Sequence, residues 1–100
     1  MTFTNITANA TKIFIETKTG LSINNLTHTA AILYTNDTIV LISIDISTSS
    51  PSKITAARVV SLVGTAPTFT IENNILKIDL RSYRTAQLII PPYFVIRNGN

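Results

Sequence analysis

The sequence contains neither cysteine nor tryptophan, and its single histidine is His28. Without cysteine, the chain is not a small extracellular domain held together by disulfides. Charged residues make up 13% of the chain, about half the usual ~25% of a globular protein. Catalytic and metal sites draw mainly on histidine, cysteine and clustered acids, so this composition favours a protein that works through its surface.

The net charge of +3 comes from eight cations and five anions, which are scattered along the chain. Nucleic-acid binding needs clustered lysine and arginine with aromatic stacking platforms, so no nucleic-acid partner is expected. The longest apolar run, Ile39–Ile46, is interrupted by Ser43 and Asp45 and is too short to span a membrane. The first residues also lack the basic and apolar regions of a secretory signal, and we therefore expect a protein that stays in the cytoplasm of the cell that makes it.

No motif of known chemistry occurs in the sequence. The acid nearest to His28 is Asp37, nine residues away, so a metal site there would need ligands from distant segments. Asp45 and Asp79 are a formal acid pair, but solvated charges on strand faces are the better interpretation. No serine lies in a Gly-x-Ser-x-Gly motif, and the three glycines are isolated, which excludes a phosphate-binding loop. We expect no enzymatic activity, no catalytic residues, no metal and no cofactor.

Threonine and isoleucine dominate the sequence, with 16 residues each. Both are β-branched and suit the pleated surface of a sheet. The clearest pattern is Ile39–Ser47, where four aliphatic residues alternate with polar ones such as Ser43 and Asp45. Such alternation predicts a half-buried strand with one apolar face.

Turn signals separate similar segments about every ten residues. The predicted strands are Lys12–Lys18, Leu21–Ile23, Thr29–Tyr34, Ile39–Ser47, Ile54–Val63, Phe69–Glu72, Ile75–Leu80, Gln87–Ile90 and Tyr93–Ile96. A helix competes over Ile54–Val63, but β-branched residues and the following Gly64 favour a strand. Asn73-Asn74 suits the two-residue loop of a hairpin. The pattern predicts an all-β fold, a single antiparallel β-sandwich of about seven to nine short strands, with jelly-roll and immunoglobulin-like topologies both open.

One domain is expected, with a polar N-terminal arm or edge strand at residues 1–11 and the sandwich at residues 12–100. Arginine and tyrosine are the residue types that anchor interfaces. The candidate interface residues are Arg81, Tyr83, Arg84 and Tyr93.

Residues Thr29–Ser50 resemble a pattern found in small structural proteins of tailed-phage virions. In that pattern a strand ending in Leu-Tyr-Thr leads through a short turn into a long alternating Ile-x-Ser-Ile-x-Ile strand. A Ser/Thr/Asn-rich loop and a Val-rich strand follow. Later come a strand of the Leu-x-Leu-x-Leu type and a proline-bearing turn before a last apolar strand, here Ile75–Leu80 and Leu88–Ile96. The turn after Tyr34 has Asn36-Asp37 in place of the Pro-Ala-Gly-like segment common in the pattern.

The resemblance implies a non-enzymatic virion protein, a capsid-decorating, neck or tail accessory component assembled in the host cytoplasm. Its partners would be other virion proteins and copies of itself, in a closed homo-oligomer, with a trimer expected before a dimer on the phage analogy. Self-association is also expected because a weakly charged surface repels its copies little. The alternative is a host-attachment module that recognises a surface glycan or receptor through the sandwich loops. An aromatic-lined groove at one end would favour the alternative, and a self-complementary flat face would favour assembly.

Overall fold

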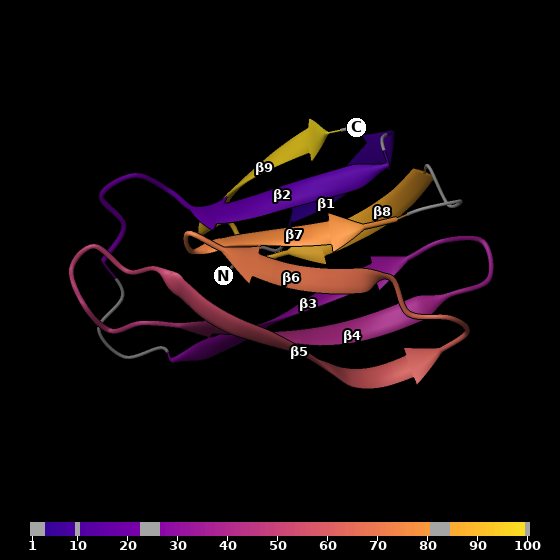
Figure 1. Ribbon diagram of the computed structural model, residues 1–100, viewed down its shortest axis with the longest axis horizontal. Helices are drawn as coiled ribbons and strands as arrows, with labels where there is room; N and C mark the ends of the chain where they lie inside the picture. Colours follow the sequence, from indigo (N-terminus) through magenta and orange to yellow (C-terminus); the bar gives the residue numbers. More distant parts are fainter. Residues whose placement is uncertain (1–3, 10, 23–26, 81–84, 100) are drawn as a thin grey trace.

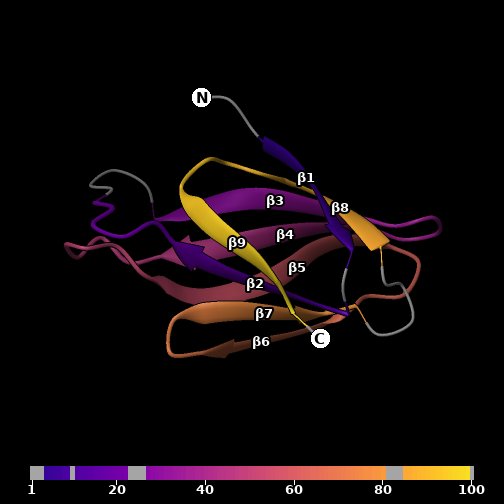
Figure 2. The same cartoon turned by 90° about the horizontal axis from the view of Figure 1, so that it is seen from above.

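The structure is a computed structural model that describes residues 4–9, 11–22, 27–80 and 85–99. Nine strands lie in this part of the chain. The strands of both sheets run mostly along the long axis of the molecule (Figure 1, Figure 2). One sheet has the order β1-β8-β3-β4-β5 and consists of β1 (Thr4–Asn9), β8 (Thr85–Ile90), β3 (His28–Tyr34), β4 (Ile39–Ile46) and β5 (Ile54–Val63). The other has the order β6-β7-β2-β9 and consists of β6 (Thr68–Glu72), β7 (Ile75–Asp79), β2 (Lys12–Thr17) and β9 (Phe94–Gly99). The predicted all-β sandwich is confirmed.

All strand pairs are antiparallel, and β1 and β2 lie in different sheets. In the constant-type immunoglobulin order the first two strands are neighbours in one sheet, so this chain has a different topology. Strand β1 pairs with β8 over six residues, and β2 pairs with β7 in the opposite sheet. Residues 4–9 therefore form an edge strand of their own chain's sheet.

The core lies between the two sheets and is aliphatic. On β4 the alternating residues predicted to face inward are all buried, namely Val40, Ile42, Ile44 and Ile46. Buried residues of β2 and β7 belong to the opposite sheet, and those of β3 and β8 belong to the same sheet as β4. These core residues are Ile13, Ile15, Leu76 and Ile78 in the opposite sheet, and Ala31, Leu33, Leu88 and Ile90 in the same sheet. Each buried aliphatic side chain contributes about 1.5–3 kcal/mol, so the period-two pattern fixes which face each strand turns inward.

The hairpin between β6 and β7 turns at Asn73 and Asn74, as expected. Both have positive φ angles, 53° and 63°, which a type I′ turn requires and which asparagine tolerates. The side-chain amide of Asn74 also donates a hydrogen bond to the carbonyl oxygen of Ile54, at 2.9 Å. The hairpin tip is thereby tied to the first residue of β5 in the other sheet.

Two expectations about local structure were wrong. Of the predicted strand Leu21–Ile23, Ile23 lies outside the described residues, and Leu21 and Ser22 are not in a strand. Instead the carbonyl oxygen of Leu21 accepts a 2.6 Å hydrogen bond from the amide of Ser52. Strand β9 continues through Gly99 and pairs with β2 along its length, although its last residues are typical of turns. Ser43, which alternates with the aliphatic residues of β4 as predicted, is nevertheless buried, because it is a small residue in the centre of the sheet between β3 and β5.

No helix long and apolar enough to cross a membrane occurs among the residues that the structure describes.

Candidate functional site

Of the four predicted interface residues, Arg81, Tyr83 and Arg84 lie outside the described residues. Tyr93 is described and is half-buried. Its ring meets that of Phe94 edge to face, with centroids 6.4 Å apart and an interplanar angle of 71°. Its carbonyl oxygen accepts a hydrogen bond from the amide of Lys18, at 3.0 Å. These contacts fix Tyr93 at one end of the sandwich, and its ring packs against the core.

The fold brings His28 opposite Asp45, its cross-strand neighbour on β4. Asp45 lies 3.7 Å from the guanidinium of Arg58 on the other side, and His28 contacts the hydroxyl of Thr27 at 3.3 Å. Asp79, the other acid considered as a possible partner, is on β7 in the opposite sheet. Within the described ranges no three histidine, cysteine or acidic side chains cluster as metal ligands.

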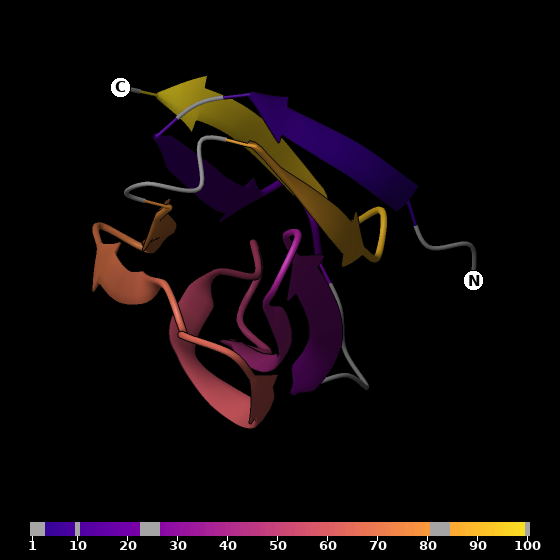
Figure 3. The same cartoon turned by 90° about the vertical axis from the view of Figure 1, so that its right-hand side faces the viewer.

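Among the side chains that the structure describes, the largest group of exposed aliphatic residues lies on β5 and the adjoining start of β4. We call this group the β5 edge, and its residues are Ile39 (55% exposed), Val59 (39%), Val60 (58%), Leu62 (43%) and Val63 (64%). Strand β5 is the last strand of its sheet. Figure 3 shows it on the side of the molecule away from β1 and β9.

The β5 edge is exposed on both faces of the sheet. Val59 and Leu62 pair with Ile42 and Val40, which are buried, so they point toward the interior layer. They are nevertheless partly accessible, because no strand of the second sheet is hydrogen-bonded to β5. The tip of the β6–β7 hairpin is tied to the opposite end of β5, at Ile54. A hollow of about 290 Å³ between β5 and this hairpin also lies at that opposite end, against Thr55–Ala57.

Two contacts hold the far end of β5 in place. The hydroxyl of Thr38 donates a hydrogen bond to the carbonyl oxygen of Thr65, at 3.3 Å. Gly64 has a φ of 96° and packs so closely on the Asp37 carbonyl that a Cβ atom would collide with it. The backbone at the end of β5 is thus fixed against the turn between β3 and β4 before any partner binds, which lowers the ordering cost of an interaction.

The β5 edge carries few of the devices that protect edge strands. Lysine, proline and inward-pointing charges normally discourage strand pairing, but residues 59–66 contain no charge and no proline. The one charge on β5 is Arg58, in an exposed pair with Asp45. The protective device that is present is a pair of register shifts against β4, at Leu41/Ile42 and Asp45/Ile46. Such irregularities increase the local twist of an edge strand, but they add no charge.

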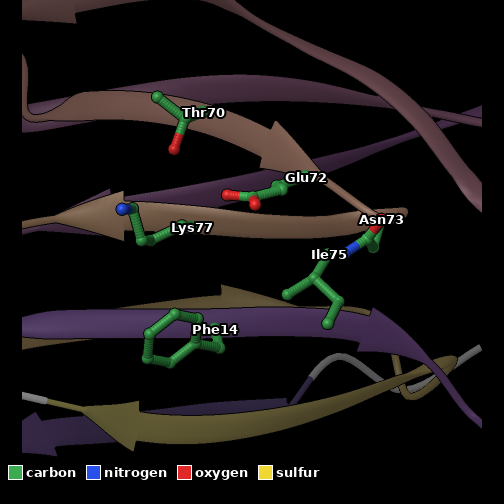
Figure 4. A pocket seen from close by; sticks show the side chains of 6 residues that line it. All are labelled: Phe14, Thr70, Glu72, Asn73, Ile75 and Lys77. Atoms are coloured by element: carbon green, nitrogen blue, oxygen red, sulfur yellow. The ribbon is translucent and has the colours of Figure 1, made fainter.

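A second candidate surface is a shallow hollow of about 170 Å³ on the second sheet (Figure 4). Its lining residues come from β2, β6, β7 and the hairpin: Phe14, Thr70, Glu72, Asn73, Ile75 and Lys77. The ring of Phe14 forms one wall in Figure 4 and lies 5.9 Å from the guanidinium carbon of Arg97. Arg97 in turn lies 3.6 Å from the carboxylate of Glu16. The hollow thus combines one aromatic ring with an acid, a cation and an amide.

The chain matches no protein-family model, and no match to a curated protein or to a solved structure was found.

Sequence reasoning predicted β5 as a strand but did not identify its exposed edge. The run Val59-Val60-Ser61-Leu62-Val63 is apolar on both faces, which by pattern alone is typical of a buried strand. The signal available was the absence of charge after Arg58. Its meaning depends on β5 lying at the edge of the sheet, and that depends on the strand order.

Proposed function

We propose that this protein is a non-enzymatic structural component of a tailed-phage virion, acting by assembly with copies of itself and with other virion proteins. The observation that carries the proposal is the β5 edge, an exposed apolar and uncharged segment of the last strand of a sheet. Exposed apolar patches rimmed by polar residues are typical of protein–protein contact sites. Long apolar edge strands are rarely left unpaired in working proteins.

The resemblance described above supports the virion setting. Its core segment, Thr29–Ser50, corresponds to β3, β4 and the loop that follows, and the Val-rich strand after it is β5. The β5 edge therefore lies within the same meander of strands that carries the resemblance. The scarce charge of the chain adds to this support, because a hydroxyl- and amide-rich surface costs less to desolvate against a partner than a charged surface does.

Protein analysis of purified particles tests this proposal. Virus particles are purified from a culture in which the protein is produced, by banding in a density gradient, and the proteins of the particles are quantified by mass spectrometry. The chain is expected to band with the particles in a fixed ratio to the major capsid protein, and to stay bound through a salt wash. A chain found only in the soluble fraction, with none in the particles, contradicts the proposal.

The hollow beside Phe14 favours a second candidate function, recognition of a host-surface glycan or receptor. An aromatic ring offers an apolar surface on which a sugar ring can pack, and the neighbouring amide and charged groups can form hydrogen bonds to sugar hydroxyls. The hollow lies on the face of the second sheet, whereas the alternative drawn from the sequence placed recognition on loops. Binding to a glycan array that is lost in Phe14→Ala, with β5 variants unaffected, would favour this function over assembly.

A further inference from the structure

The geometry points to a second copy of this chain as the occupant of the β5 edge, with the two β5 strands pairing antiparallel across a two-fold axis near Ser61. This inference rests on the proposed function, because it names the surface through which assembly begins. The pairing would join two five-stranded sheets into one continuous sheet.

The apolar run of β5 is complementary to a copy of itself. A two-fold interface places the same patch on both partners, so the patch must fit itself. Residues 59–63 are aliphatic except for Ser61. An antiparallel pairing centred there sets aliphatic residues against aliphatic residues, and the two serine hydroxyls can bond to each other.

The proposed pairing brings no like charges opposite one another. Like charges directly opposite one another destabilise a strand pair, and residues 59–66 contain none. The nearest cation, Arg58, is already beside Asp45, at 3.7 Å. The two-fold axis therefore brings together no bare like charges, and the net charge of +3 adds little long-range repulsion.

The pairing would bury enough surface for a weak interface. The four β5 side chains of the β5 edge expose on the order of 300 Å² of apolar surface, at the lower end of the range in which a patch is often functional. Ile39 is on β4, one strand further from the partner, and is not counted. Two such strands with their flanking backbone would bury roughly 1,000 Å² in total, the size of a weak or transient interface. A dimer that forms only at high protein concentration is the expected result.

Analytical ultracentrifugation of the full chain, from low micromolar to several hundred micromolar, tests the dimer. The wild-type protein is expected to shift from monomer to dimer over this range. Val60→Lys and Val63→Lys should weaken the dimer at least tenfold, because both side chains are largely exposed in the monomer and a lysine would be desolvated on pairing. The matched control is Val95→Lys, which changes another exposed valine on β9 and should leave the dimer unchanged. Thermal melts at low concentration check that each variant folds.

Cysteine crosslinking tests the two-fold axis, since the chain has no cysteine of its own. Directly opposite residues of an antiparallel pair have Cα atoms about 4.5–5.5 Å apart, within the range of a disulfide. Ser61→Cys should form a covalent dimer on mild oxidation, whereas Thr48→Cys, in an exposed loop, should not. A monomer at every concentration, a trimer, or a dimer that survives Val60→Lys and Val63→Lys would overturn the inference. Banding of the chain with virions would still support the proposed function in each of these cases.

Discussion

Replacing Ile44 with aspartate probes the buried face of β4, on which the sandwich depends. Ile44 is fully buried, and its cross-strand neighbours are Thr29 on β3 and Ala57 on β5. Truncating a buried isoleucine to alanine alone costs about 2–5 kcal/mol. A carboxyl group at this position would be buried in the aliphatic core, which adds several kcal/mol more. A 100-residue domain is stable by about 5–15 kcal/mol, so Ile44→Asp is expected to prevent folding.

Two variants calibrate this prediction. Ile44→Val removes one methylene group and should cost about 1 kcal/mol, measured as a lower urea midpoint with an unchanged slope. Ala30→Asp places the same charge on an exposed position of β3 and should change the stability by less than about 0.5 kcal/mol. Far-UV circular dichroism is the assay, because the chain has no tryptophan. A soluble Ile44→Asp protein with a cooperative transition near that of the wild type would refute the assigned facing of β4.

Three further predictions concern the turns and the absence of ligands. Asn74→Ala should destabilise the fold by about 2 kcal/mol and Asn73→Ala by about 1 kcal/mol. Alanine tolerates a positive φ poorly at either position, and only Asn74→Ala also removes the hydrogen bond to Ile54. Equal urea midpoints for the two variants would contradict this. Gly64→Ala should lower the melting temperature more than Gly20→Ala, because both have positive φ but a Cβ atom at Gly64 would meet a backbone carbonyl, while at Gly20 it would meet open space. Zinc, calcium or ATP should not raise the melting temperature; a rise of several degrees would reveal a site, since a ligand at 100 times its Kd adds about 2.7 kcal/mol.

The sequence predicts the strands well wherever apolar and polar residues alternate. On β4 the alternation identifies the inward face, because a one-residue slip in register would turn the buried Ile42, Ile44 and Ile46 from the core to the solvent. The turn at Asn73-Asn74 is predicted for an equally local reason, since few residues tolerate two positive φ angles in succession.

Features that depend on tertiary neighbours could not be predicted in this way. Asn98 and Gly99 are typical turn residues, yet β9 runs through them because β2 lies alongside. At Gly99 a Cβ atom would collide with the ring of Phe14, so glycine is what permits this close approach. No local pattern encodes that contact.

The candidate site also follows from tertiary structure. Residue type alone predicted an interface at Arg81, Tyr83, Arg84 and Tyr93. The β5 edge instead arises because β5 is the last strand of its sheet and β6 does not pair with it. Local periodicity does not determine strand order, so the same apolar residues could have belonged to a buried strand.

Hydrogen exchange compared between the free and assembled protein tests most directly whether the β5 edge is the surface used in assembly. In dilute solution the amides of residues 59–63 that point away from β4 should exchange rapidly, because no strand in the described part of the chain pairs with that side of β5. In the concentrated protein or on the particle the same amides should be protected, while those of β9 should keep their rates. Unchanged exchange along β5, with new protection around Phe14, would contradict the account.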